Sequence, residues 1–147
     1  MIDRFNTWLN THAFAVLRIS LGIVYVWFGA LKYFPNTSPA DQLAKETITI
    51  LTFGLIPASV SIILLAVWET LLGMLLITGV WKRVVYYFLL LHLACTFVPL
   101  FAFVDLSFSQ PPMVFTLVGQ YIVKNIVFIS AAIVLNREFR INLHPQQ

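Results

Sequence analysis

The chain has 147 residues, of which 60% are hydrophobic and only 10% are charged. Because soluble domains carry about 25% charged residues, this composition excludes an ordinary soluble protein and predicts an integral membrane protein. The net charge of +3 and the lack of a basic face in the sequence argue against nucleic-acid binding. The single cysteine, Cys95, excludes an internal disulfide or a CxxC redox pair, and we expect it to be an inert, buried thiol.

Four stretches are long and apolar enough to cross a bilayer, which takes about 20 residues in a helix. They are residues 13–33, 59–79, 84–103 and 113–135. The first is not a cleaved signal peptide, because its apolar run is too long and contains Arg18. Since the four stretches occupy more than half of the chain, we expect a single integral-membrane domain over residues 1–147. The predicted fold is all-α, an up-down bundle of four transmembrane helices.

The connection between the first two spans predicts a short helix on the outer surface. Ser38 can cap a helix, Pro39 suits the first helical position, and Asp41 favours the positive end of the helix dipole. We therefore expect a helix at about residues 39–52. The connection between the last two spans, residues 104–113, is polar and contains two prolines, so it is predicted to be a loop.

Basic residues indicate how the bundle is oriented. With four spans, both termini and the connection between the second and third spans share one side of the membrane. That side carries most of the basic residues, namely Arg4, Lys82, Arg83, Arg137 and Arg140. The opposite loops carry Lys45, with Lys32 at the edge of the first span. Because basic loops stay on the cytoplasmic side, we expect both termini in the cytoplasm.

Five ionisable residues fall inside the spans or at their edges: Arg18, Lys32, Glu69, His92 and Lys124. Charges in a bilayer face the interior of a bundle and find partners there. Glu69 and Lys124 lie at similar depths when residues are counted from the inner ends of their spans, at about 1.5 Å per residue. We therefore predict that Glu69 pairs with Lys124 through the centre of the bundle.

The other three ionisable residues fit this centre less directly. Arg18 lies nearer the inner end of its span, where its side chain can reach the interface; a link to Glu69 or to a bound anionic group stays open. Lys32, at the outer edge, is expected to extend to the interface in the same way. His92 is expected to be a hydrogen-bonded interior histidine, and no metal site is predicted because no second histidine shares its depth.

Small and polar residues mark the faces that point into the bundle. On the first span they recur at steps of three and four, at Arg18, Gly22, Tyr25, Gly29 and Lys32. The matching faces are Ala66, Glu69 and Gly73 on the second span, and Gln120, Lys124, Val127 and Ala131 on the fourth. Gly22, Gly29 and Gly73 are expected to allow close helix packing. Lys32, Tyr25 and Gln120 are candidate contacts for a ligand or lipid.

Three stretches of the sequence resemble the DoxX family of small membrane proteins. "LRISLGIVYVWFGALKYFP" (residues 17–35) is similar to the family's first span, with its Leu-Arg, glycine and lysine positions. "WETLLGMLLITGVWKR" (68–83) resembles the second span, and "GQYIVKNIVFISAAIVL" (119–135) the last. The chain also resembles related proteins linked to reactive-chlorine resistance, although its outer loop is shorter than theirs.

The resemblance implies a four-helix protein of the bacterial inner membrane. Members of the family occur as subunits of, or partners to, oxidoreductases, including thiosulfate:quinone oxidoreductase and detoxifying enzymes, which connects them to redox stress. We therefore expect a non-catalytic accessory or anchoring subunit of a membrane-associated, quinone-linked oxidoreductase system. Arg18, Lys32, Glu69 and Lys124 are the positions at which this chain matches the family pattern, and the resemblance assigns them no catalytic role.

Two other functions stay open. A small proton-coupled transporter or ligand-binding membrane protein would use the buried Glu69, Lys124 and His92, but four unbroken helices enclose little room. An enzyme acting alone on a quinone or lipid lacks a recognisable nucleophile–base pair or metal set, so no catalytic residue is predicted. No cofactor is predicted either, although a bound quinone or lipid is left open. The expected partners are the lipid bilayer and an oxidoreductase or a second copy of the chain.

Overall fold

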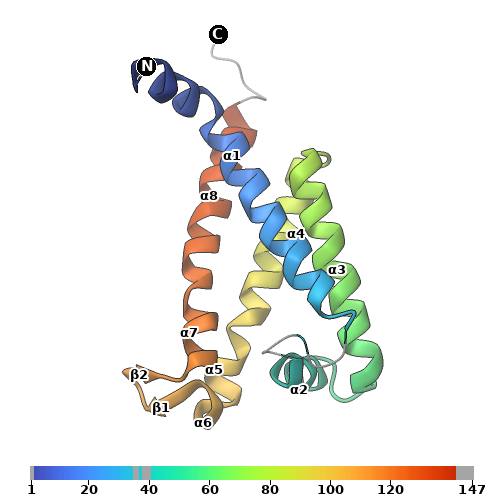
Figure 1. Ribbon diagram of the computed structural model, residues 1–147. Helices are drawn as coiled ribbons and strands as arrows, with labels where there is room; N and C mark the ends of the chain where they lie inside the picture. Colours follow the sequence, from blue (N-terminus) through green and yellow to red (C-terminus); the bar gives the residue numbers. More distant parts are fainter. Residues whose placement is uncertain (1, 35–36, 38–40, 142–147) are drawn as a thin grey trace.

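The computed structural model describes residues 2–34, 37 and 41–141 (Figure 1). The helices are α1 (Ile2–Leu31), α2 (Asp41–Leu51), α3 (Ala58–Thr78), α4 (Lys82–Thr96), α5 (Val98–Ala102), α6 (Val104–Ser107), α7 (Leu117–Val123) and α8 (Asn125–Ile141). A short antiparallel hairpin joins β1 (Phe108–Gln110) to β2 (Val114–Phe115). Within the described residues, α1, α3, the pair α4–α5 and the pair α7–α8 are long and apolar enough to cross a membrane. The predicted all-α membrane fold with four spans is therefore confirmed.

The four spans form a bundle in which α1 and α4 each pack against both α3 and α8. This arrangement places α3 and α8 on opposite corners. In Figure 1 the start of α1 and the end of α8 lie at one end of the bundle, which we call the terminal end. Helix α2 and the β1–β2 hairpin lie at the other end, and α2 packs against α3 and α5 there. We call this the α2 end.

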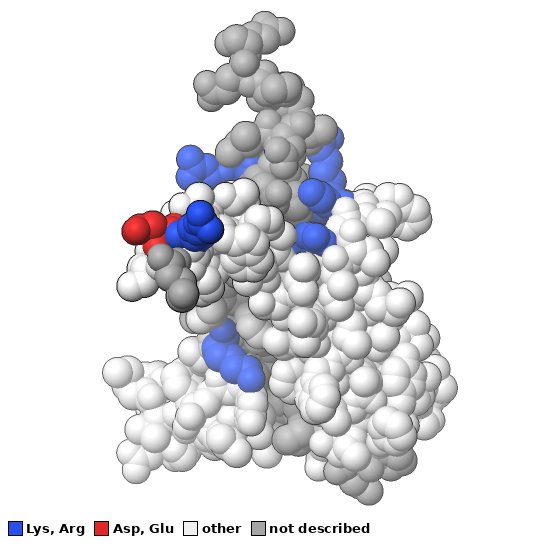
Figure 2. All heavy atoms as spheres, turned by 45° about the horizontal axis from the view of Figure 1, so that its top comes forward, with Lys and Arg blue, Asp and Glu red and all other residues white. Residues whose placement is uncertain are grey.

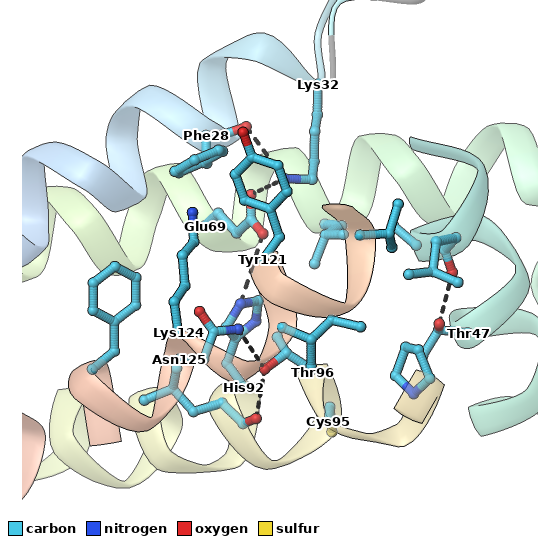
Figure 3. Close-up of a pocket in the computed structure, with 18 of the residues that line it drawn as sticks. Phe28, Lys32, Thr47, Glu69, His92, Cys95, Thr96, Tyr121, Lys124 and Asn125 are labelled. Carbon is cyan, nitrogen blue, oxygen red and sulfur yellow. Dashed lines mark hydrogen bonds and ion pairs between the residues drawn. The ribbon is translucent and has the colours of Figure 1, made fainter. Parts of the chain in front are cut away.

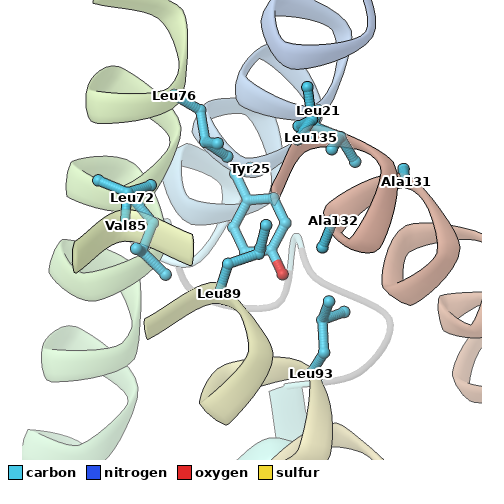
Figure 4. Packing of buried hydrophobic residues seen from close by; sticks show 10 residues of the cluster. All are labelled: Leu21, Tyr25, Leu72, Leu76, Val85, Leu89, Leu93, Ala131, Ala132 and Leu135. Carbon is cyan, nitrogen blue, oxygen red and sulfur yellow. The ribbon is translucent and has the colours of Figure 1, made fainter. Parts of the chain in front are cut away.

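The apolar core fills the half of the bundle nearer the terminal end (Figure 4). Its buried members come from all four spans and are Leu21, Tyr25, Leu72, Leu76, Val85, Leu89, Leu93, Ala131, Ala132 and Leu135. Leu89, Leu93 and Leu135 are each 1% exposed, so the bundle is closely packed in this half. The polar and charged residues of the spans lie nearer the α2 end.

Glycines bring α1 and α3 into backbone contact. A Cβ atom built on Gly22 would lie 2.7 Å from the carbonyl oxygen of Gly73, and one on Gly73 would lie 2.6 Å from that of Gly22. A Cβ on Gly29 would lie 2.6 Å from Thr70 Oγ1. Because real Cβ atoms do not approach other heavy atoms this closely, only glycine allows this separation of the two helices. All three glycines predicted to lie at helix contacts are thus found between α1 and α3.

Several boundaries differ from the sequence-based prediction. Helix α1 begins at Ile2 because the polar residues before the apolar run, all exposed, continue the helix beyond the bundle. Residues 104–113, predicted to be a loop, instead form α6 and β1 before a turn. Since β1 pairs with β2, the last span starts at Leu117 rather than at residue 113.

The surface helix is present as α2, over Asp41–Leu51. Its first residue, Asp41, accepts a hydrogen bond at 2.6 Å from Lys45, one turn further on. The predicted capping residue Ser38 and first helical residue Pro39 lie outside the described residues.

Candidate functional site

A cavity of about 270 Å³ lies in the half of the bundle nearer the α2 end (Figure 3). It is bounded by α1, α2, α3, α4, α5 and the α7–α8 span, and its wall is mostly apolar. The polar and thiol side chains in the wall are Tyr25, Lys32, Thr47, Glu69, His92, Cys95, Thr96, Tyr121, Lys124 and Asn125. Tyr25 and Lys32, expected as ligand contacts, thus line this cavity.

The cavity exists because α2 covers the end of the bundle without filling it. On α2, Leu43 and Thr47 are buried and face inward, while Ile50 and Leu51 are exposed. The Thr47 hydroxyl donates a hydrogen bond to the Leu43 carbonyl oxygen at 2.6 Å, so this polar group is satisfied within its own helix. Helix α2 therefore separates the charged residues behind it from the surroundings.

The cavity opens on the side of the bundle between α2 and α7. Leu51 on α2 and Leu117 and Tyr121 on α7 all line it, and these three residues are 41%, 67% and 41% exposed. These exposed side chains give the cavity a largely apolar rim. Figure 2 shows Lys or Arg side chains recessed in a furrow on one face, away from the end where most of the Lys and Arg residues gather.

A buried group of three side chains lies in the wall of the cavity. Lys32 Nζ lies 2.6 Å from Glu69 Oε2, and His92 Nε2 lies 3.7 Å from Glu69 Oε1. The side chains of Lys32 and Glu69 are only 6% and 9% exposed. Lys32 also donates a hydrogen bond to the Phe28 carbonyl oxygen at 3.3 Å, and Tyr25 packs edge-on against the His92 ring with centroids 5.3 Å apart. The carboxylate thus lies between a lysine and a histidine.

The predicted pair of Glu69 with Lys124 is therefore wrong, and so is the prediction that Lys32 extends to the interface. The reason is the register of α1 against α3. The antiparallel packing that places Gly22 against Gly73 and Gly29 against Thr70 also brings Lys32 to the level of Glu69. A lysine side chain leans toward the N-terminus of its helix, which here means back into the bundle.

Lys124 lies instead at an interruption of the fourth span. Helix α7 ends at Val123 and α8 begins at Asn125, and the Val127 N–H bonds to the Lys124 carbonyl oxygen three residues back. Lys124 Nζ lies 4.0 Å from the centroid of the Tyr121 ring and 5.4 Å from that of Phe28. In Figure 3 its side chain extends from the α7–α8 span toward α1.

The two rings do not fully replace the water that this ammonium loses in a membrane. A cation–π contact contributes about 0.5–2 kcal/mol, whereas a lysine at the centre of a transmembrane helix costs about 2.5–3.5 kcal/mol. No hydrogen bond or ion pair of Lys124 Nζ is found within the part of the chain that the structure describes. The two ring contacts therefore offset only part of this cost.

Next to Lys124, Asn125 connects the fourth span to the third. Its side-chain Nδ2 donates to Thr96 Oγ1 at 3.0 Å, and the Thr96 hydroxyl donates to the Leu93 carbonyl oxygen at 2.7 Å. This contact lies at the end of α4, whose last residue is Thr96. Three residues later, Pro99 has no N–H that could continue the helix. The sequence analysis missed both Asn125 and Thr96, although a polar pair at the same level of two adjacent spans is a usable signal.

Arg18 does not belong to the buried charged group. It donates hydrogen bonds to the carbonyl oxygens of Leu76 and, at 2.9 Å, Ile77. These are carbonyls in the last turn of α3, which have no partner within the helix and carry the negative end of its dipole. Arg18 thus caps α3 at the terminal end of the bundle, far along α1 from Lys32, so a link between Arg18 and Glu69 is not formed within the described residues.

The predicted inward face of the fourth span is also largely wrong. Gln120, Lys124 and Val127 are exposed, and of the predicted face only Ala131 is buried. Gln120 does not line the cavity. The interruption at Lys124 changes the helical phase, so that Ile122 before it and Ala132 after it are buried.

Cys95, expected to be an inert, buried thiol, lines the cavity and is partly exposed. Its position makes it a native reporter of the cavity, because the chain contains no other cysteine.

Chemically, the site as a whole offers an apolar chamber, an ammonium group between two aromatic rings, and an amide beside it. These groups suit an apolar molecule with a polar head.

Comparison with known proteins connects this arrangement to a family. The DoxX family model matches residues 13–104, which include the resembling stretches in the first two spans but not the one in the last. No curated protein and no solved structure shows a significant match. The matched region contains Lys32, Glu69 and His92, so the buried charged group lies within it. Because the match covers more than half of the chain, the protein belongs to the DoxX family.

Proposed function

We propose that this DoxX-family protein is a non-catalytic membrane component of a quinone-linked oxidoreductase system. In this proposal the cavity holds the ring of a quinone, and a partner enzyme in or on the membrane carries out the electron transfer. The observation that supports it best is the apolar cavity that opens sideways toward lipid and carries hydrogen-bond donors in its wall. The family's known association with oxidoreductases is the basis for assigning a redox partner.

The chemistry of the wall fits a quinone ring. A quinone is planar and apolar on its faces, and its two carbonyl oxygens accept hydrogen bonds. Lys124 and Asn125 have N–H groups beside the cavity, and the rings of Phe28 and Tyr121 offer flat surfaces. The volume of about 270 Å³ is at the lower end of ligand pockets, which span about 300–1,000 Å³. One ring therefore fits, and its apolar tail would leave through the opening between α2 and α7.

A proton-coupled carrier is the second candidate, because Glu69 lies between Lys32 and His92 in the manner of membrane proton relays. The fourth span is also interrupted at Lys124, which weakens the expectation of four unbroken helices. A carrier must open its site alternately to both sides of the membrane. The closely packed core at the terminal end, including Leu89 and Leu135, blocks the second exit in this structure, so the carrier is the weaker candidate.

The first prediction is that quinone is retained by the purified protein and lost when the cavity is filled. Ala44 lines the cavity from α2, and Ala44→Trp should fill much of it. We expect extraction and mass spectrometry of the wild-type protein, purified in mild detergent, to give up to one quinone per chain. Ala44→Trp should retain less than about a tenth of that amount, because the ring has no remaining space.

The matched control is Ala94→Trp, which adds the same side chain to an exposed position of α4. It should retain quinone as the wild type does. Equal retention by both tryptophan variants, or no quinone in the wild type, would contradict the cavity assignment. A stoichiometric oxidoreductase in the same preparation would support the accessory role, and a protein that purifies with quinone but without any redox partner would count against that role.

The second prediction concerns orientation in the bacterial inner membrane. Figure 2 shows Lys and Arg gathered at the end of the molecule where the chain begins, and Arg4, Lys82, Arg83 and Arg137 belong to that end. The positive-inside rule then places both termini in the cytoplasm and the cavity in the outer leaflet. Reporter tags at either terminus should give a cytoplasmic signal, while a probe at Lys45 should be reached from outside. A periplasmic signal from either terminus would overturn the orientation.

A further inference from the structure

The charges around the cavity do not balance. Lys32 and Glu69 form a buried ion pair, so their charges cancel within the wall. Lys124, which belongs to the α7–α8 span, contributes a further positive charge in the same cavity, near the rings of Tyr121 and Phe28. The lysines that line the cavity, Lys32 and Lys124, thus outnumber its one carboxylate, Glu69. A bilayer penalises such a charge, and proteins place a negative group beside it.

No side chain of the described residues supplies that negative group. Among the described residues that line the cavity, Glu69 is the only acidic one. Both of its oxygens have nearer partners, Lys32 at 2.6 Å and His92 at 3.7 Å. Asp41 on α2 is paired with Lys45 at 2.6 Å. Glu69 and Asp41 thus each already have a cation of their own.

The position of Lys124 also argues against simple extension to the membrane surface. It lies seven residues after the first residue of α7, Leu117, which corresponds to a depth of about 10 Å along the helix. Its side chain extends across toward α1 rather than along the span (Figure 3), and its ammonium lies over the Tyr121 ring. The interruption between α7 and α8 occurs at this residue. The ammonium is therefore held at the cavity, next to the opening.

We propose that Lys124 is an anion-binding residue and that the cavity takes an apolar molecule bearing one ionised oxygen acid, which it places against the Lys124 ammonium. Two kinds of molecule have this chemistry: a single-chain carboxylate, and a ring compound with an acidic hydroxyl group, such as a hydroxyquinone. Asn125, bonded to Thr96 through its Nδ2, keeps the wall beside Lys124 in place.

This inference uses the same cavity as the proposed function but does not depend on the quinone. A hydroxyquinone would refine that function, because the ring would be bound in its ionised form. A fatty carboxylate would keep the charge assignment and remove the quinone from the cavity. The experiment must therefore compare the two kinds of molecule, each with a neutral partner of the same shape.

The test uses two pairs of probes on the full-length protein in lipid nanodiscs at neutral pH. One pair is the acidic hydroxynaphthoquinone lawsone and its neutral methyl ether, and the other is oleate and methyl oleate. Binding is followed as protection of Cys95, the only thiol and a cavity residue, against a membrane-permeant maleimide. We expect the acid of at least one pair to bind about 10- to 100-fold more tightly than its neutral partner, the range given by a charge-assisted hydrogen bond.

The variants assign the preference to one residue. Lys124→Met should reduce the acid-to-neutral ratio to about one. Because Lys124 also lies beside the carbonyl oxygens of a quinone in the proposed function, the folding of this variant is checked by its thermal unfolding curve, followed by circular dichroism, and not by its affinity for the neutral partner. Lys124→Arg should keep the preference, because the positive charge is retained. Lys45→Met is the control, since Lys45 is on the same side of the molecule but does not line this cavity; it should behave as the wild type does.

Each outcome decides between the proposals. A preference within the lawsone pair alone supports both the anion site and the quinone function. A preference within the oleate pair alone supports the anion site and contradicts the quinone as the ligand. Equal binding of acid and neutral partners in both pairs, or a preference that survives in Lys124→Met, overturns the anion site; strong protection by the neutral quinone would then leave the proposed function standing.

Discussion

Replacing Lys32 with methionine is expected to lower the free energy of unfolding by about 3–5 kcal/mol, the usual cost of leaving one half of a buried ion pair without its partner. The physical reason is that Glu69, 7% exposed, would keep a negative charge in a medium that solvates it poorly. Glu69 can reduce this cost by taking up a proton, and His92 at 3.7 Å can share it, so the lower part of the range is expected at acidic pH.

A double-mutant cycle isolates the contribution of the pair. Lys32→Met, Glu69→Gln and the double variant should be compared by equilibrium unfolding in mixed micelles, followed by circular dichroism. We expect the double variant to be more stable than the sum of the two single losses predicts, by about 2 kcal/mol or more, because no unpaired charge remains.

Lys45 and Asp41 provide a control with the same separation of 2.6 Å but side chains 33% and 21% exposed. Their cycle should give a coupling of only about 0.3–0.5 kcal/mol, as for other ion pairs one helical turn apart near a surface. Simple additivity at Lys32 and Glu69 would mean that the two residues do not interact in the membrane. A large coupling at Lys45 and Asp41 would mean that burial is not what distinguishes the two pairs.

The pairing of Glu69 illustrates what the sequence does and does not determine. Hydropathy locates the four spans because each must match the thickness of a bilayer. Small residues at helical steps locate Gly22, Gly29 and Gly73 because only glycine permits backbone contact. The depth of each charged residue in the membrane, however, is predicted by counting from the ends of its span, which treats all helices as parallel. In the structure α1 crosses α3 at an angle (Figure 1). Lys32 therefore reaches Glu69, although the count of residues places the two at different depths.

The cavity could not be predicted for a different reason. It depends on where α2 folds back over the bundle, and the residues leading into α2 carry no periodicity that fixes this direction. The prediction of which face of the fourth span points inward is wrong because the interruption at Lys124 shifts the helical phase. Neither glycine nor proline marks that position in the sequence. The capping role of Arg18 depends on free carbonyls at the end of α3, which Arg18 can reach only because α3 packs beside α1.

Replacing Gly22 with valine is expected to separate α1 from α3 and to destabilise the protein by at least about 1–3 kcal/mol, the usual cost of overpacking. The added Cβ would meet the Gly73 carbonyl oxygen and Ile77 Cγ1, both at 2.7 Å. A carbonyl oxygen belongs to the backbone and cannot move aside as a flexible side chain can, so a helix must shift. Ser20→Val is the control, because Ser20 is on the same helix but exposed; it should change stability by less than about 0.5 kcal/mol.

The double variant Gly22→Val with Gly73→Val tests whether one contact is responsible. Once α1 and α3 have separated to accommodate the first valine, the second meets less resistance, so the two losses should be clearly less than additive. Separation of the helices should also move Lys32 away from Glu69, since both pairs lie between α1 and α3. The coupling between Lys32 and Glu69 should therefore fall when it is measured in the Gly22→Val background. Fully additive losses, together with an unchanged ion-pair coupling, would show that the two helices do not hold each other at the separation that the glycines indicate.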